Sequence, residues 1–390
     1  MKQLNRIAVF AVTALSLAAC QKQSKILSPI TNSIDETAFT STNSSEFGTG
    51  SSKHVYTLSN QVSGNAVLDY VRAFDGKLTY STAYATGGTG TGGGLGNQGA
   101  VILKEDDDNV LLAVNPGSNS ISSFNVSGNG LQLRSTVNSG GMRPVSITQH
   151  DNIVYVLNAG GTGNISGFKL GNNNKLTPIA NSERALSSSA SGAAQISFVN
   201  EGRVLVITEK ATNKIITYTV NEWGMPGTMH FITSANATPF GFDAGKNGNI
   251  FVSEAAGGAA GASTLSSYHV YNNGVITLTE GPVGANQSAA CWVVITDNGK
   301  YAYTTNTASN NISNFNVSRN TGNLSVNTAI AATTDMGPID AALSNNSKYL
   351  YIVNTGSHTI GAYAVANNGS LSSVQIIAGL PVGSTGLAAR

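Results

Sequence analysis

The chain has 390 residues, of which 11% are charged, compared with roughly 25% in an ordinary soluble domain. Its formal net charge is +1 and 41% of its residues are hydrophobic, which excludes disorder driven by charge and leaves no basic excess for binding nucleic acid. The 44 glycines, with abundant Asn, Ser and Thr, are typical of a β-rich globular protein and not of a helical bundle.

The first nineteen residues are expected to be a bacterial lipoprotein signal peptide. A short positive segment ends at Arg6, and the apolar run Ile7–Ala19 is too short to span a bilayer as a helix. The run leads into Cys20 in a sequence, LAAC, that resembles the lipobox in which the cysteine is acylated. An ordinary signal peptide followed by a chance cysteine is the alternative. We expect lipidation at Cys20, and a location at the bacterial cell envelope, on the periplasmic or extracellular side, anchored through the lipid only.

Residues 20–53 hold this cysteine and a stretch rich in Ser, Thr, Asn and Gln without hydrophobic periodicity, which indicates a flexible tether. The folded domain is expected at 54–390. If Cys20 is lipidated, Cys291 has no partner for an intramolecular disulfide, so packing has to stabilise this domain.

From His54 onward one unit repeats seven times. Each unit has a short apolar strand ending in Asn or Glu, a polar turn, and a second strand ending in an aromatic residue. The strand-end residues are Asn60, Asn115, Asn158, Glu209, Glu254, Asn306 and Asn354. The aromatic residues are Tyr70, Phe124, Phe168, Tyr218, Tyr268, Phe315 and Tyr363.

A Gly/Asn turn and a third strand follow each pair, and a stretch of small residues then leads into a fourth strand. Four antiparallel strands in each of seven units predict an all-β fold, the seven-bladed β-propeller. The domain opens with what corresponds to the second strand of a blade, whereas residues 383–390 resemble an innermost strand. We therefore predict that the C-terminal strand closes the first blade and removes an exposed edge.

The units YIVNTGSHTIGAY, YTTNTASNNISNF and VLNAGGTGNISGF resemble the repeats of the seven-bladed propeller lactonase family, which includes 6-phosphogluconolactonases and carboxymuconate-lactonising enzymes. Stretches such as VLVITEKATNKIITY resemble more closely a secreted lipoprotein branch of that family, and the likeness covers about 54–390. The resemblance implies a lactonase-like hydrolase acting on a small sugar-derived or aromatic lactone, with its site at one mouth of the central channel.

The resemblance also implies three functional residues: a His in a Pro-His segment entering an inner strand, an acid after a second strand, and an Arg at a later equivalent of that place. The acid corresponds to Glu209, whereas Glu254 stands where the Arg is expected. None of the segments matched to Pro-His contains His; they are Pro144-Val145, Ala194-Gln195, Pro239-Phe240, Ala290-Cys291 and Pro338-Ile339.

Three charged residues are the candidates for catalysis. Glu209 and Glu254 replace the Asn of the other repeats, so both are expected to point toward one channel mouth. Opening a lactone needs a base near the attacking water and a donor facing the oxyanion, roles that would fall to Glu209 and Arg143. The five Asn residues Asn60, Asn115, Asn158, Asn306 and Asn354 would complete a ring around the mouth.

Two alternatives compete with catalysis at these carboxylates. A loop carboxylate can simply accept backbone N–H bonds at a turn, as Asn does in the other repeats. The carboxylate pair with the Asn oxygens could instead hold a divalent cation such as Ca²⁺, although no cofactor is expected from any recognised loop motif.

Several other features are interpreted as structural. The glycine run at 87–94 contains a formal GxGxxG, but no helix follows, so a flexible inter-blade loop near the mouth that could act as a lid is the better interpretation. The acidic run 105–108 indicates a solvated hairpin turn, and Cys291 a small buried side chain. The five scattered histidines indicate no metal site.

Two functions therefore remain open from the sequence. One is lactone hydrolysis; the other is a non-catalytic propeller, expected to be monomeric, that binds a ligand or an envelope protein at the mouth.

Overall fold

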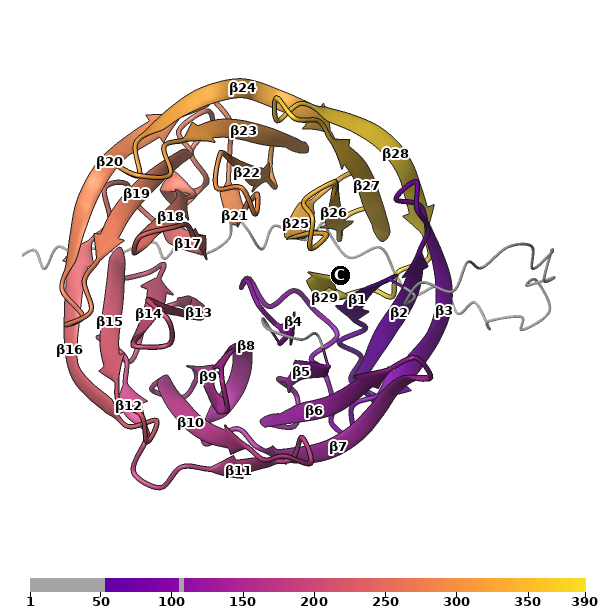
Figure 1. Ribbon diagram of the computed structural model, residues 1–390, viewed down its shortest axis with the longest axis vertical. Helices are drawn as coiled ribbons and strands as arrows, with labels where there is room; N and C mark the ends of the chain where they lie inside the picture. Colours follow the sequence, from indigo (N-terminus) through magenta and orange to yellow (C-terminus); the bar gives the residue numbers. More distant parts are fainter. Residues whose placement is uncertain (1–52, 105–108) are drawn as a thin grey trace, which may run out of the picture.

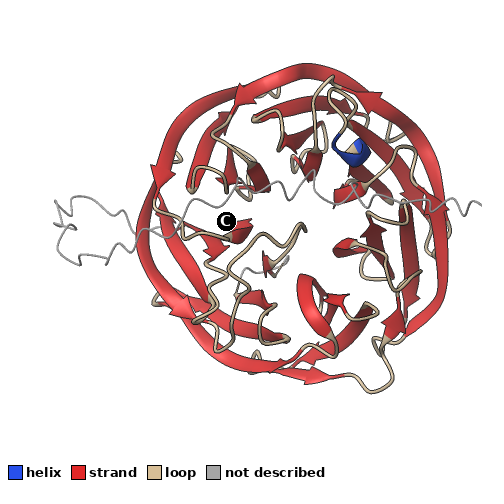
Figure 2. Ribbon diagram, turned by 180° about the vertical axis from the view of Figure 1, so that it is seen from behind, coloured by secondary structure: helices blue, strands red, loops and turns tan. Residues whose placement is uncertain are grey.

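The computed structural model describes residues 53–104 and 109–390 and contains seven antiparallel sheets arranged radially around a central channel (Figure 1). Six sheets have four strands, and the third blade carries a short additional strand, β12 (Arg184–Ala185). The predicted seven-bladed β-propeller is confirmed. The strands fill the ring almost completely, and within the described ranges the helical element is a single 3-10 turn, η1 (Ala256–Gly258) (Figure 2).

The strands form four concentric layers. The innermost strands of blades 1 to 7 are β29 (Thr385–Ala389), β4 (Val101–Leu103), β8 (Met142–His150), β13 (Ala193–Val199), β17 (Pro239–Ala244), β21 (Ala290–Ile295) and β25 (Pro338–Leu343). The second strands are β1 (Lys53–Leu58), β5 (Val110–Asn115), β9 (Ile153–Gly160), β14 (Val204–Glu209), β18 (Asn249–Glu254), β22 (Tyr301–Asn306) and β26 (Tyr349–Asn354).

The two outer layers follow the same order. The third strands are β2 (Ala66–Arg72), β6 (Ser120–Ser127), β10 (Asn164–Leu170), β15 (Lys214–Val220), β19 (Thr264–Val270), β23 (Asn311–Val317) and β27 (Thr359–Val365). The outermost strands are β3 (Leu78–Ala85), β7 (Gly130–Asn138), β11 (Leu176–Pro178), β16 (Pro226–Thr233), β20 (Ile276–Gly284), β24 (Leu324–Thr333) and β28 (Leu371–Ala378).

Burial follows these layers and explains the sequence pattern. The second strands β5 and β14 are buried at every position, because neighbouring blades cover both of their faces, and both begin as continuous apolar runs. The outermost strands β16 and β28 instead mix exposed with partly buried positions, since one face is open to solvent. The core therefore lies between the blades.

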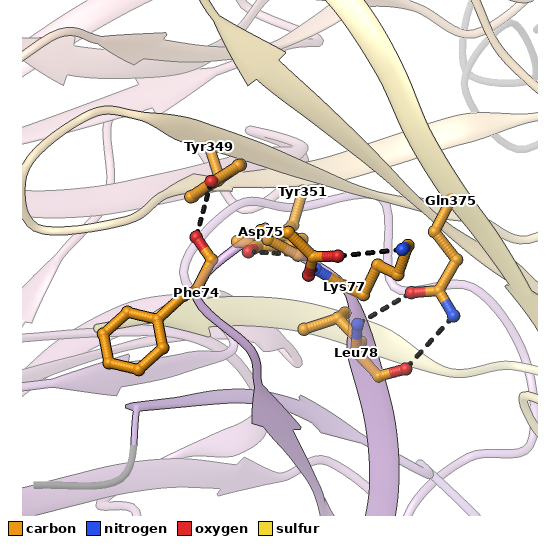
Figure 3. Close-up of polar contacts among 8 residues, drawn as sticks. Phe74, Asp75, Lys77, Leu78, Tyr349, Tyr351 and Gln375 are labelled. Carbon is orange, nitrogen blue, oxygen red and sulfur yellow. Dashed lines mark hydrogen bonds and ion pairs between the residues drawn. The ribbon is translucent and has the colours of Figure 1, made fainter. Parts of the chain in front are cut away.

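The ring closes across the chain termini, as predicted. β29 pairs antiparallel with β1, with Tyr56 opposite Ala388. Blade 7 also bonds to blade 1 through side chains, since Tyr351 Oη donates to the carbonyl of Gly76 at 3.0 Å (Figure 3). Gln375 holds the backbone N–H and carbonyl of Leu78, at 2.7 and 3.2 Å.

The same tyrosine-to-turn bond joins blades inside the ring. Tyr155 Oη donates to the Gly224 carbonyl at 2.6 Å, and Tyr303 Oη donates to the Gly369 carbonyl at 2.8 Å. Each carbonyl lies in the outer hairpin of the following blade. The joint that contains the chain ends is therefore built like the internal joints.

Some sequence predictions lie outside the described residues: the signal peptide, the lipidation of Cys20, most of the tether and the acidic run 105–108. Among the residues that are described, no helix is long and apolar enough to cross a bilayer.

Candidate functional site

The strand-end residues of the seven repeats lie at one face of the ring. Glu209 pairs with Ala193 and Glu254 with Pro239, so the second strands end where the innermost strands begin. All seven of these side chains are at most 1% exposed. The predicted ring of Asn and Glu therefore lies inside the turns and is not exposed at the channel mouth.

Glu209 is held entirely by the turns around it. Its Oε1 accepts the backbone N–H of Ser187 at 2.8 Å, and its Oε2 accepts the hydroxyls of Ser187 and Thr212, the latter at 2.5 Å. Ser187 belongs to the connection that leads into β13. The carboxylate thus fastens that connection to the end of β14.

Glu254 has still more donors. Its Oε1 accepts from Ser234 Oγ at 2.7 Å, from the Asn236 backbone N–H at 3.1 Å and from Tyr268 Oη at 3.0 Å. Its Oε2 accepts from the hydroxyls of Thr264 and Ser266 at 2.5 and 2.7 Å. Five bonds from two segments of the chain, the connection into β17 and the strand β19, fix this carboxylate in place.

The Asn side chains at equivalent positions also form hydrogen bonds around the strand ends. Asn306 Nδ2 donates to Asn311 Oδ1 and to Ser313 Oγ, each at 2.8 Å, and Asn60 Nδ2 donates to the carbonyl of Gly93 at 2.7 Å. The alternative interpretation of Glu209 and Glu254 as turn acceptors therefore describes their contacts. Within 53–104 and 109–390, no group of three or more His, Cys, Asp or Glu is placed to hold a metal ion.

Arg143 is exposed at this same face, at the start of β8. Its backbone has a φ of +53°, and its N–H donates to Asn119 Oδ1 of the preceding blade at 2.7 Å. Four equivalent residues also have positive φ, namely Gly192, Thr238, Ala289 and Gly337. The backbone conformation is thus common to the fold, whereas the guanidinium belongs to blade 3 alone.

Lys210 is a candidate functional residue that the sequence did not indicate. It follows Glu209 directly, is partly buried, and donates from Nζ to the carbonyl of Gly96. Nζ lies 4.6 Å from the centroid of the Phe240 ring. Burial, and then the charge of Arg143, lower the pKa of Lys210 to about 7. The amine therefore exchanges its proton near neutral pH.

The carbonyl that Lys210 holds belongs to a segment that crosses the channel, which we call the plug (Leu95–Gly99). Figure 1 shows the connection between β3 and β4 entering the channel. Trp292 Nε1 donates to the Asn97 carbonyl at 2.7 Å, and the Gln98 side chain bonds to both the carbonyl and N–H of Val293, at 2.8 and 3.1 Å. The plug, which directly follows the glycine-rich loop 87–94 predicted to be flexible, is thus anchored to the opposite side of the ring.

Two further inner-strand residues accommodate the plug. A Cβ on Gly241 would lie 2.1 Å from Gln98 Oε1, so only glycine leaves room there. On blade 7, the Asp340 carboxyl accepts backbone N–H bonds from Ala341, Gly99 and Leu387. These bonds favour the charged form, but burial outweighs them and raises the pKa of Asp340 to about 8.

Two spaces adjoin these residues. A cavity of about 180 Å³ next to the plug is lined by Gln98, Gln149, Gln195 and Asp340, among others. A groove of about 430 Å³ lies beside Arg143 and is lined by Met142, the glycine-rich turn 160–163 and Arg184. The groove is large enough for a small organic molecule.

One sequence interpretation needs correction. In blade 4 the segment equivalent to Pro144-Val145 is Ala193-Ala194 and not Ala194-Gln195, because Ala193 pairs with the strand-end Glu209 as Pro144 pairs with Asn158. Cys291 is fully buried in β21, as expected.

Residues 271–384 match the family model "Lactonase, 7-bladed beta-propeller". That segment is less than a third of the chain. No curated protein matches the sequence significantly. The match supports a relationship with the lactonases.

Solved structures with the same architecture are distant in sequence. A candidate 6-phosphogluconolactonase from Bacteroides fragilis has a TM-score of 0.68 at 15% identity, covering 88% of this chain and 100% of its own. A second, from Bacteroides uniformis, has a TM-score of 0.66 at 16% identity, with coverages of 85% and 99%. The periplasmic gluconolactonase of Pseudomonas aeruginosa has a TM-score of 0.65 at 14% identity, with coverages of 86% and 99%. At these identities the likeness establishes the fold.

Proposed function

We propose that the protein is a lactonase-like hydrolase that opens a small sugar-derived or aromatic lactone at the channel mouth, with Lys210 and Arg143 as the reacting pair. The observation that carries the proposal is the position of Lys210, a partly buried amine near the residue Arg143, whose side chain is exposed, at the face where β14 ends and β8 begins. The match to the lactonase family model supports it.

In this reaction the neutral amine of Lys210 accepts a proton from the water that attacks the lactone carbonyl carbon. The Arg143 guanidinium stabilises the negative charge that develops on the carbonyl oxygen. The ring C–O bond then breaks, and the leaving alkoxide takes up a proton to give a hydroxy acid. A proton-transfer group works best when its pKa lies near the working pH, which fits a pKa of about 7.

Glu209 takes a different part from the one its sequence position indicates. Its carboxylate is 0% exposed and saturated by hydrogen bonds, so it fixes the strand end from which Lys210 projects. In this proposal Glu209 is a positioning residue, and Glu254 holds the corresponding turn of blade 5 without contacting substrate.

The test is acid release from a panel of sugar-derived and aromatic lactones by the full chain. Lys210→Met should lower kcat/KM by about 100-fold or more, the usual contribution of a general base. Lys214→Met is the matched control, since Lys214 also lies 4.6 Å from an aromatic ring, that of Phe231, in the same blade. Equal activity of the two variants would contradict the assignment of Lys210.

A second function is favoured by the complete burial of both carboxylates, which leaves the mouth without an exposed acid of the kind that the resemblance implies. The protein would then bind a small molecule or an envelope partner without turnover. No turnover on any lactone, together with ligand-dependent shifts in melting temperature, would favour this function.

We also propose that the protein is held at the bacterial envelope by a lipid on Cys20, on the sequence evidence alone. Incorporation of labelled palmitate into the wild type, and its loss in Cys20→Ala, would test this.

A further inference from the structure

Lys210 differs from every residue that follows the strand-end Asn or Glu in the other repeats. Those residues are Gln61, Pro116, Ala159, Ala255, Thr307 and Thr355. None is basic, although the local backbone bonds recur: the N–H of Lys210 donates to the Gly192 carbonyl at 3.1 Å, and that of Ala255 to the Thr238 carbonyl at 3.0 Å. The fold of the turn therefore does not require a lysine, and its amine needs another explanation.

The surroundings of the amine are those of a nucleophile. Nζ lies over the face of Phe240, which is itself 1% exposed and packs on Trp292 with ring centroids 4.9 Å apart. Burial at this place disfavours the ammonium form, and the Arg143 charge disfavours it further. Desolvation and a neighbouring cation are the two devices that activate lysines toward carbonyl compounds.

The plug shows that a carbonyl group can meet this amine. The Gly96 carbonyl oxygen accepts the bond from Nζ, so a carbonyl group already meets the amine where the amine lies over the Phe240 ring. A peptide carbonyl is too unreactive to be attacked, but an aldehyde or ketone that displaced it would lie within reach of the nitrogen.

We propose that Lys210 is a carbonyl-reactive amine that forms an imine with small aldehydes or ketones bearing a carboxylate, and that Arg143 binds the carboxylate. The amine nitrogen adds to the carbonyl carbon, the carbonyl oxygen takes a proton to give a carbinolamine, and loss of water leaves the C=N bond. No oxidant or reductant is needed. This covalent chemistry goes beyond the proposed hydrolysis, in which Lys210 only accepts a proton.

The charges around the amine fit an anionic carbonyl compound. Arg143, on β8, is exposed and bonded only through its backbone to Asn119 in the contacts described, so its guanidinium faces solvent. The nearest carboxylate in sequence, Glu209, is occupied by Ser187 and Thr212. A ligand carboxylate would therefore meet the Arg143 guanidinium without competition from Glu209.

The experiment traps the imine by reduction. The full chain is incubated at pH 7 with glyoxylate and cyanoborohydride, and the modified lysines are identified by peptide mass mapping. We expect Lys210 to be modified at least about tenfold faster than Lys214, because an ordinary lysine, with a pKa near 10.4, is almost wholly protonated at this pH. Lys210→Arg should remove that adduct, whereas Lys214→Arg should leave it unchanged.

A second arm separates the role of Arg143. Arg143→Gln should slow modification by glyoxylate more than modification by acetaldehyde, which lacks the carboxylate. Uniform labelling of lysines, or labelling at Lys210 that is no faster than at Lys214, would overturn the proposal even if lactones are hydrolysed. Labelling of Lys210 without lactone turnover would support it and count against the hydrolase, so the two proposals fail separately.

Discussion

Blades 4 and 5 end their second strands with the same residue and use it in the same way, yet only one of the two ends is suited to chemistry. Glu209 and Glu254 are both fully buried, and both accept hydrogen bonds from the connection that leads into the inner strand of their own blade. The next residue in blade 5 is Ala255, which is 0% exposed, whereas in blade 4 it is Lys210. The substitution of Glu for Asn therefore serves the structure of the turn, and the residue that we propose to be functional is its neighbour Lys210.

The largest effect is expected from removing the better-bonded carboxylate. Glu254→Ala would remove the acceptor of five hydrogen bonds inside the protein. Because each unsatisfied buried group costs about 1–3 kcal/mol, we expect a loss of about 3 kcal/mol or more in the free energy of unfolding. Urea denaturation measures it, with the less bonded Glu209→Ala losing less.

Glu254→Gln is the control, since its amide keeps one acceptor oxygen and should retain part of that stability. A fully stable Glu254→Ala would show that the carboxylate does not hold the turn, and the parallel between the two blades would fail.

The two ends of the plug also differ. Gly96 contacts the partly buried Lys210, whereas Gly99 lies at the buried acid Asp340. Its pKa is raised to about 8 in the folded chain, above roughly 3.9 for an unfolded aspartate, so the folded state binds the proton more tightly. The contribution of Asp340 to the free energy of unfolding is therefore fully present below about pH 4 and declines as the pH rises to about 8. In Asp340→Asn the melting temperature should no longer fall over this pH range. A melting temperature that depends on pH as in the wild type would contradict the prediction.

Lys210 should give a smaller effect of the opposite sign. Its pKa is about 7 in the folded chain and near 10.4 when unfolded, so between these values the unfolded state binds the proton more tightly. Wild-type stability should then rise from pH 7 to 10, and Lys210→Met should flatten that rise. The control Lys214→Met should keep the wild-type slope, and a slope retained in Lys210→Met would assign the pH dependence to another group.

The repeat made the fold predictable, because seven strand pairs with a fixed Asn/Glu-to-aromatic order have few ways to bury both faces. The C-terminal strand was predictable for the same reason, since the first blade lacked its inner strand. The environment of individual side chains could not be predicted. A strand-end Glu reads the same in sequence whether it lines a mouth or accepts Ser187 and Thr212 inside a turn.

Lys210 could not have been singled out from local sequence. Its character comes from Phe240, from Arg143 in the preceding blade, and from a carbonyl 114 residues away in the plug. The plug could not be predicted either, because the glycine-rich stretch before it resembles a flexible loop. Asn97 and Gln98 anchor the plug by hydrogen bonds to Trp292 and Val293, which lie far away in the sequence.

The plug also affects how a small molecule can enter and leave the central channel. A channel through a ring has two openings, but here a segment tied to blades 4 and 6 lies inside it, next to Lys210. We expect a molecule that enters from the face of Arg143 and Lys210 to leave through the same opening. Departing product therefore obstructs arriving substrate, and the opened hydroxy acid should act as a competitive inhibitor of its own formation.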